Sequence, residues 1–147
     1  MIFGQRYKLK TECKMKVSRG LRNNNPGNIR NSSTVWLGEI IPSKDKSFKQ
    51  FKSMAYGYRA LIKLLQNYRK LYGCQTVADF IKKWAPPTEN NTNGYILSVC
   101  KDLQVTREYV PDIADKDTMC AFAAAISQVE NDTPANIADV HKGWELL

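Results

Sequence analysis

The sequence predicts a single mainly helical (α+β) domain with one small β-hairpin, over residues 19–147, preceded by a basic N-terminal arm or strand at residues 1–18. Three observations favour this fold class. The chain of 147 residues is long enough to bury its own hydrophobic core. Apolar residues recur at helical spacing in several stretches after residue 53, whereas a pattern typical of paired strands occurs only between residues 34 and 51.

Residues 19–30, here called the Asn-rich segment, read Arg-Gly-Leu-Arg-Asn-Asn-Asn-Pro-Gly-Asn-Ile-Arg. Asn and Gly favour left-handed backbone and Pro removes a backbone donor, so the composition predicts a structured loop instead of a helix or an interior strand. Its amide side chains can donate and accept hydrogen bonds. Two roles stay open: the loop lines a site for a polar ligand, or it only caps neighbouring helices.

The remaining elements follow in order. Residues 34–51 predict the hairpin, and the spacing of apolar residues from Ser53 to Tyr72 predicts a long helix that ends at Gly73. Four more helices are expected. The first runs from the cap Thr76 to Pro86, and the second is capped within the loop at residues 88–92 and carries apolar residues from Tyr95 to Leu103. The third runs from Asp115 or Asp117 to about Val129, and a short fourth starts at Thr133 and Pro134.

One carboxylate stands out near the end of the fourth predicted helix. At about 100° per residue, Glu130 falls on the same face as the apolar residues Met119, Phe122 and Ile126. Burial and the negative end of the helix dipole would both favour the protonated carboxylic acid, which is the form that a general acid needs. The alternative is a structural glutamate that pairs with a nearby cation.

Charge and cysteine spacing narrow the function classes. The formal charge of +8 predicts attraction to polyanions, but nucleic acid is a poor candidate because no basic helix face or known motif is present. Cys13, Cys74, Cys100 and Cys120 form no Cys-x-x-Cys pair, and His141 is the only histidine, so we expect no metal and no cofactor. The last three cysteines are expected as small core residues, with disulfides left open.

The sequence also bears on where the protein acts. The first residues lack the apolar run of a signal peptide, and no stretch reaches membrane-spanning length. We therefore expect a monomer made in the cytoplasm that reaches an external target through lysis, inside a virion or by a dedicated export apparatus.

Several motifs together resemble those of a family of small phage and Bacteroidetes proteins often described as virion structural proteins, which is placed in the lysozyme-like superfamily. The resemblance covers residues 18 to 145. Its motifs are the Asn-rich segment, Trp36-x-Gly38, Phe48-x-x-Phe51, Gly57-Tyr58-Arg59-Ala60, Trp84-Ala85-Pro86-Pro87-x-Glu89-Asn90-x-Thr92 and Tyr95-Ile96. The resemblance implies a lysozyme-like helical domain.

The order of these motifs is also similar to that of bacterial glucosaminidases that cleave peptidoglycan. In those enzymes a helix that ends in the catalytic Glu comes before the corresponding stretch, whereas here Glu12 lies in a lysine-rich arm. The run Ala125-Ile126-x-x-x-Glu130-Asn131 instead resembles the helix ends of lytic transglycosylases. We therefore expect a circularly permuted lysozyme-like fold.

The resemblance implies cleavage of peptidoglycan glycan strands by a muramidase, glucosaminidase or lytic transglycosylase. Glu130 would be the general acid, with Glu39 and then Glu89 as candidates for a second carboxylate. Substrate contacts are expected from Asn25, Asn28, Arg30, Trp36, Trp84 and Tyr95. The alternative is a non-catalytic cell-wall-binding or virion structural module that keeps the fold without the chemistry.

Overall fold

The computed structural model describes residues 17–147, so the arm predicted at residues 1–18 lies almost wholly outside the described residues. The elements are α2 (Arg19–Arg22), β1 (Glu39–Ile40), β2 (Gln50–Phe51), α3 (Met54–Tyr72), α4 (Val77–Trp84), α5 (Thr92–Leu103), α6 (Lys116–Asn131) and α7 (Ile137–Glu145). This confirms the predicted fold class: mainly helical with one small antiparallel hairpin.

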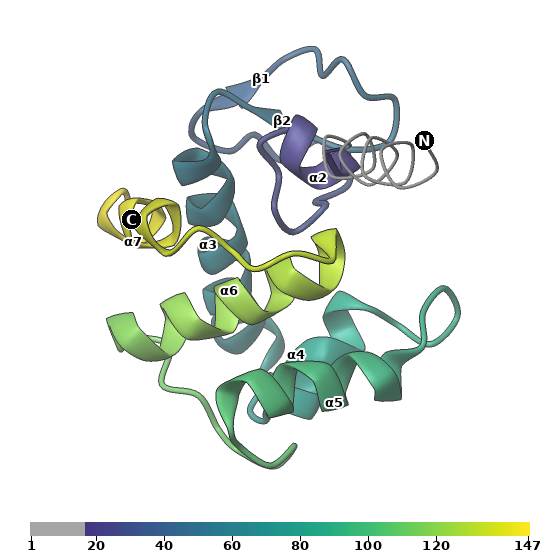
Figure 1. The fold of residues 1–147 in the computed structure, drawn as a ribbon, viewed down its shortest axis with the longest axis vertical. Helices are drawn as coiled ribbons and strands as arrows, with labels where there is room; N and C mark the ends of the chain where they lie inside the picture. The colour runs from purple at the N-terminus through teal and green to yellow at the C-terminus, as the bar shows by residue number, and fades with distance from the viewer. Residues whose placement is uncertain (1–16) are drawn as a thin grey trace, which may run out of the picture.

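The long helix α3 connects the two ends of the molecule (Figure 1). The hairpin and α2 lie at one end, and α4 and α5 lie at the other. Between them α6 crosses α3, and its C-terminal end reaches toward the Asn-rich segment. Residues distant in sequence therefore meet where α6 ends.

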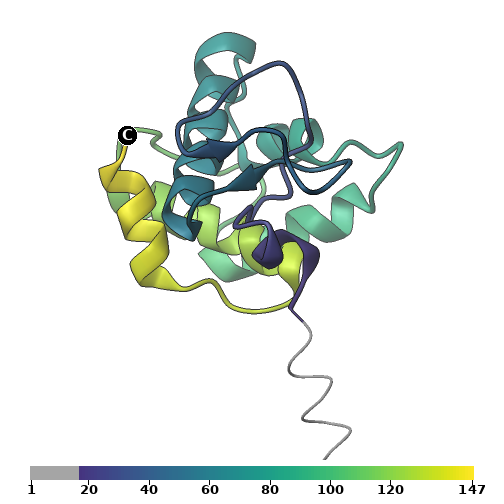
Figure 2. The ribbon, with the colours of Figure 1, turned by 90° about the horizontal axis from the view of Figure 1, so that it is seen from above.

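Helix α7 lies beside the first turns of α3, which Figure 2 shows from above. Gly143 makes this approach possible, because a Cβ there would come within 2.7 Å of the Tyr58 Cβ and 2.8 Å of the Arg59 nitrogen. The Arg59 guanidinium also donates to the Leu146 carbonyl over 3.1 Å. The C-terminal helix is thus fixed against the centre of the fold.

The helix ends follow the local sequence signals. Gly73 ends α3 with a left-handed φ of 69°, which is accessible to Gly at little cost. Thr76 and Asp79 form the predicted capping box at the start of α4. Asp115 caps α6 by accepting from the Thr118 backbone N–H.

Three boundaries differ from the predictions. Ser18 caps a four-residue helix at the start of the Asn-rich segment, where no helix was expected, because the first four residues precede the asparagine run. Helix α6 continues past Val129 to Asn131, with Asp132 left-handed as its cap. Helix α7 begins at Ile137 after the cap Asn136, three residues beyond Pro134.

The main hydrophobic core lies between the helices, and a smaller cluster of Ile29, Phe51 and Ala60 lies under the hairpin. Half-buried Trp84 packs against both clusters. Cys74, Cys100 and Cys120 are buried free thiols, as expected of small core residues, and Cys13 lies outside the described residues. None of the helices within residues 17–147 is long and apolar enough to cross a membrane.

Candidate active site

Glu130 is held in place by two hydrogen bonds from different parts of the chain. The Tyr95 hydroxyl on α5 donates to Oε2 over 2.7 Å, and Asn28 Nδ2 in the Asn-rich segment donates to Oε1 over 3.0 Å. The glutamate itself is half-buried in the last turn of α6. Each carboxyl oxygen keeps a second hydrogen-bonding position, so the group is oriented without being saturated.

Tyr95 is itself part of a short hydrogen-bonded chain. Trp84 Nε1 donates to the Tyr95 oxygen over 3.1 Å, so the hydroxyl proton points on to Glu130. Burial raises the pKa of Tyr95, and the nearby charge of Glu130 and the hydrogen bond to it raise that pKa further. The hydroxyl therefore stays a donor to the carboxylate at any physiological pH.

Asn131, the residue after Glu130, ties the helix end to the Asn-rich segment. Its Nδ2 donates to the Pro26 carbonyl over 2.9 Å, and its Oδ1 accepts from Ser18 Oγ over 2.7 Å. Adjacent side chains of one helix end thus serve two purposes: Asn131 fixes the loop, and Glu130 meets Asn28 from that loop.

The backbone of the segment is shaped to present Asn28. This residue has a left-handed φ of 50°, and its Oδ1 is buried with no hydrogen-bond partner among the described residues. A Cβ on Gly20 would come within 2.9 Å of that oxygen, so only glycine leaves room there. A carboxylate can only accept hydrogen bonds, so the Asn28 side chain must turn its NH₂ group toward Glu130. This orientation leaves the Asn28 Oδ1 without a partner among residues 17–147.

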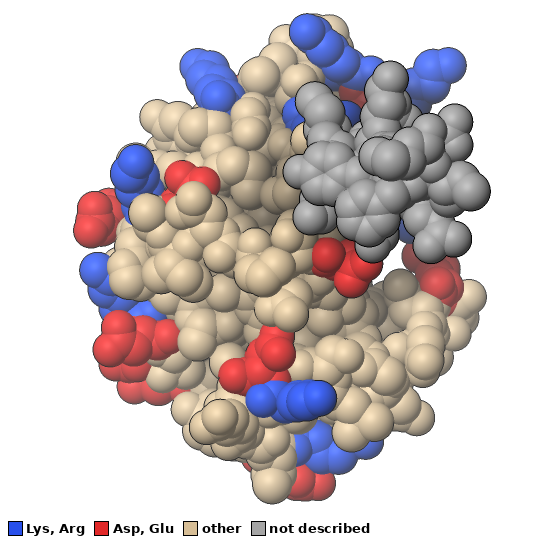
Figure 3. Space-filling view, in the orientation of Figure 1, with Lys and Arg blue, Asp and Glu red and all other residues tan. Residues whose placement is uncertain are grey.

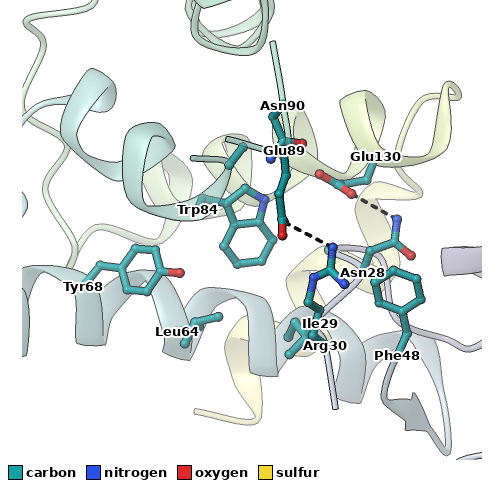
Figure 4. A pocket seen from close by; sticks show the side chains of 12 residues that line it. Asn28, Ile29, Arg30, Phe48, Leu64, Tyr68, Trp84, Glu89, Asn90 and Glu130 are labelled. Carbon is teal, nitrogen blue, oxygen red and sulfur yellow. Dashed lines mark hydrogen bonds and ion pairs between the residues drawn. The ribbon is translucent and has the colours of Figure 1, made fainter. Parts of the chain in front are cut away.

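Glu130 opens onto a cavity of about 420 Å³, a size that suits a small ligand or part of a chain (Figure 4). In the close view Leu64 and Tyr68 on α3 lie along one side, with Trp84 facing them. The full lining is Gly27, Asn28, Ile29, Arg30, Phe48, Leu64, Tyr68, Trp84, Ala85, Glu89, Asn90 and Glu130.

An exposed ion pair joins the two sides of this cavity. Arg30 Nη2 lies 3.3 Å from Glu89 Oε2, and the two side chains are 67% and 60% exposed. The Arg30 guanidinium also lies 5.5 Å from the centre of the Phe48 ring. Such an exposed pair is worth little in stability, so it can open when a ligand enters.

The structure brings together four of the predicted substrate contacts. Asn28, Arg30 and Trp84 line the cavity, and buried Tyr95 reaches it through its bond to Glu130. Of the carboxylates, Glu130 and Glu89 line the cavity.

Glu39, the first candidate for a second carboxylate, lies outside the cavity. Both of its oxygens accept from Lys49 Nζ at 3.1 Å, and Oε1 also accepts from the Trp36 backbone N–H. The two charged side chains are only 6% and 1% exposed. This buried ion pair holds the hairpin region together and leaves Glu39 without access to a substrate.

Asn25 and Trp36, two of the predicted substrate contacts, also lie outside the cavity. Asn25 is fully buried, and its amide bonds to the backbone of Ile29 and Lys49, which makes it a brace inside the loop. Trp36 packs over the small cluster under the hairpin and borders a separate shallow depression. Neither residue lines the cavity.

Sequence reasoning missed three notable lining residues: Phe48, Leu64 and Tyr68. Tyr68 belongs to the regularly spaced apolar residues of α3, and Leu64 stands next to one of them. Helical periodicity assigns such residues to the core. Phe48 pairs with Arg30 through an isolated antiparallel bridge. The position of Phe48 at the cavity depends on that long-range pairing, which the local sequence does not predict.

Figure 3 shows one face of the molecule, on which carboxylates lie between lysine and arginine side chains. Residues 1–16, outside the description, supply five of the 22 lysines and arginines but only one of the 14 acidic residues. Half of the formal charge of +8 thus comes from that segment. Among residues 17–147 no cluster of His, Cys, Asp or Glu side chains could hold a metal ion.

The fold and the cavity together define a small helical protein with a hydrogen-bonded glutamate in a ligand-sized cleft. No family model matches the sequence. The chain is 32% identical to Protein P5 of Pseudoalteromonas phage PM2 over 133 residues, which are 88% of this chain and 82% of that protein. It therefore belongs to the same family as this phage protein.

Proposed function

We propose that the protein cleaves the glycan strands of peptidoglycan, with Glu130 as the general acid. The observation that carries this proposal is the placement of the Glu130 carboxyl group, which two donors orient toward a cavity of about 420 Å³. Oriented carboxyl groups in clefts are the usual proton donors of glycoside cleavage.

In the proposed step, Glu130 gives its proton to the oxygen that links two sugars. The bond between that oxygen and the anomeric carbon breaks, the leaving sugar keeps the proton, and an oxocarbenium-like centre forms. Tyr95 and Asn28 then stabilise the carboxylate left on Glu130, since both donate hydrogen bonds to it. The same two bonds that orient the acid also favour its charged product.

Glu89 is the proposed second carboxylate, because it lines the cavity and Glu39 does not. If Glu89 activates a water molecule, the products carry ordinary reducing ends. If Glu89 only holds Arg30, one of the substrate's own hydroxyl groups attacks the oxocarbenium-like centre, and the product ends in an anhydro sugar. Analysis of the product ends therefore separates a hydrolase from a lytic transglycosylase.

Substrate contacts are proposed from the cavity wall. Once Glu89 releases it, Arg30 can form paired hydrogen bonds with the lactyl carboxylate of an N-acetylmuramic acid unit that carries no stem peptide. Trp84 and Tyr68 offer aromatic faces to the apolar side of a sugar ring. We further propose that the resemblance to lysozyme-like enzymes reflects a permuted version of that fold, and that the protein acts at the cell wall after delivery in a virion or by an export apparatus.

The replacement Glu130→Gln tests the proposal, because it keeps the shape of the side chain and removes the acidic proton. We expect the clearing of purified peptidoglycan to slow by about 100-fold or more, with little change in the thermal melting temperature. Exposed Glu108, which does not line the cavity, supplies the matched control Glu108→Gln. Full activity in Glu130→Gln would rule out the assigned acid.

A second candidate is a non-catalytic wall-binding or virion structural module. The similarity to Protein P5 of phage PM2 supports a phage-related role, and such a role does not require cleavage. Under this candidate the unaltered protein would bind peptidoglycan from several bacteria in a sedimentation assay and release no sugar fragments. Release of fragments by the parent protein, and not by Glu130→Gln, would exclude it.

A further inference from the structure

A row of aromatic rings continues beyond the cavity along α3. Trp84 and Tyr68 line the cavity with ring centres 6.4 Å apart, and Tyr72 follows with its ring centre 6.3 Å from that of Tyr68. Tyr72 lies outside the cavity, in the last turn of the helix. The row therefore leads from the site near Glu130 to the protein surface.

Tyr72 is 63% exposed, so most of its ring contributes nothing to the hydrophobic core. It borders a second, open depression, with Gly73, Lys82 and Lys83 among its lining residues. A single exposed aromatic side chain needs no special explanation. Its continuity with the row of rings in the cavity is what makes it notable.

Lys83, in the last turn of α4, places its ammonium group over the Tyr72 ring. Its Nζ lies 3.8 Å from the centre of the Tyr72 ring and 5.3 Å from that of Tyr68. Within the described part of the chain it forms no ion pair with a carboxylate. The ammonium group is thus fixed by aromatic contacts, with hydrogen-bonding capacity left for a ligand.

The spacing suits an extended chain of sugars. Leu64, Tyr68 and Tyr72 follow one another at steps of four residues, and each step advances about 6 Å along the helix axis. This is comparable to the length of one sugar unit. A strand that follows α3 away from Glu130 would pass Tyr68 first and Tyr72 next.

We propose that Tyr72 and Lys83 form a distal subsite for a carboxylate-bearing sugar of the glycan strand. The exposed part of the Tyr72 ring packs on the apolar side of the sugar beside the Lys83 ammonium. That ammonium binds the lactyl carboxylate, which muramic acid carries free where its stem peptide has been removed and which neutral N-acetylglucosamine lacks. The inference rests on the proposed function, because it concerns the same strand that Glu130 would cleave.

The test compares Tyr72→Ala and Lys83→Ala with the control Lys70→Ala. Lys70 is an exposed cation in the same last turn of α3, but it lines neither depression. Substrates are long peptidoglycan glycan strands freed of their stem peptides, a tetrasaccharide as the short substrate, and neutral chitin strands. KM and kcat are measured for each protein on each substrate.

We expect both variants to raise KM for long wall strands by about tenfold, the size of one well-placed contact, and to leave kcat and all values for the tetrasaccharide unchanged. Tyr72→Ala should also raise KM for chitin, whereas Lys83→Ala should not, because chitin lacks the carboxylate. Unchanged KM for long strands, or an equal rise for the tetrasaccharide, would overturn the subsite.

A binding measurement separates this inference from the proposed cleavage. If the parent protein binds strands without cleaving them, the proposed function fails, and the subsite is judged by the dissociation constant for long strands. That constant should then rise by about tenfold in both variants and not in Lys70→Ala. If the parent neither cleaves nor binds any strand, the subsite is refuted together with the function.

Discussion

Removal of the Tyr95 hydroxyl tests how Glu130 is positioned. In Tyr95→Phe the carboxylate loses a 2.7 Å hydrogen bond, and Trp84 Nε1 loses its acceptor. A hydrogen bond to a charged group is worth about 1.5–3 kcal/mol. If this bond acts in the transition state, kcat/KM for wall cleavage should fall by about 10- to 100-fold.

Stability should change less than activity, because the ring of Tyr95 stays in the core and only its oxygen is removed. A loss of about 1 kcal/mol would lower the melting temperature by roughly 2–4 °C in a chain of this size. A thermal melt of Tyr95→Phe therefore shows whether lower activity merely reports unfolding.

A double-mutant cycle with Glu130→Gln gives the decisive result. If Tyr95 works only by orienting and stabilising the Glu130 carboxyl group, the double variant should be no slower than Glu130→Gln alone. Turbidity clearance of purified peptidoglycan supplies the rates. Fully additive losses would refute the reasoning, because they would mean that Tyr95 contributes independently of Glu130.

Three further predictions concern stability. The Arg19 guanidinium and backbone N–H groups hold the pKa of Asp45 well below its usual range, so Asp45→Asn should lower the melting temperature at pH 7. The difference in melting temperature between the parent protein and the variant should shrink as the pH falls below about 4, because the carboxyl group of the unfolded chain becomes protonated there. An unchanged difference at pH 2 would contradict this. Gly57→Ala should cost about 1–3 kcal/mol in urea unfolding, because the new Cβ would overlap a carbonyl oxygen of the Asn-rich segment; wild-type stability would show that the segment can move away. Lys49→Met should lower the free energy of unfolding by about 3–5 kcal/mol, because it leaves the Glu39 carboxylate buried and unpaired. Adding Glu39→Gln to this variant should recover part of that loss in the same urea assay.

Local signals were sufficient to predict the five longer helices, α3 to α7, though not every boundary. The spacing of apolar residues and the caps Gly73 and Thr76 predicted α3 and the start of α4 correctly, because these features depend on residues within one or two turns. The inward direction predicted for Glu130 likewise follows from helical periodicity alone, and the structure has it half-buried.

Local signals misassigned side chains whose role depends on distant partners. Asn25 was predicted as a substrate contact and Glu39 as a second catalytic carboxylate. Their partners in the fold are backbone carbonyls and Lys49, which consume their hydrogen-bonding capacity. A sequence pattern carries no information about which polar groups become satisfied internally.

By itself, then, the sequence determined the five longer helices, most of their caps, the small hairpin and the charge. Short-range backbone preferences and periodicity decide these structural features. Only the tertiary structure decided the site. Asn28 and Glu130 are 102 residues apart, and Tyr95 is 35 residues from Glu130, yet all three meet at one carboxyl group. Their meeting depends on how α6 packs across α3 and against the Asn-rich segment. That packing is decided by the burial of apolar residues from the whole chain.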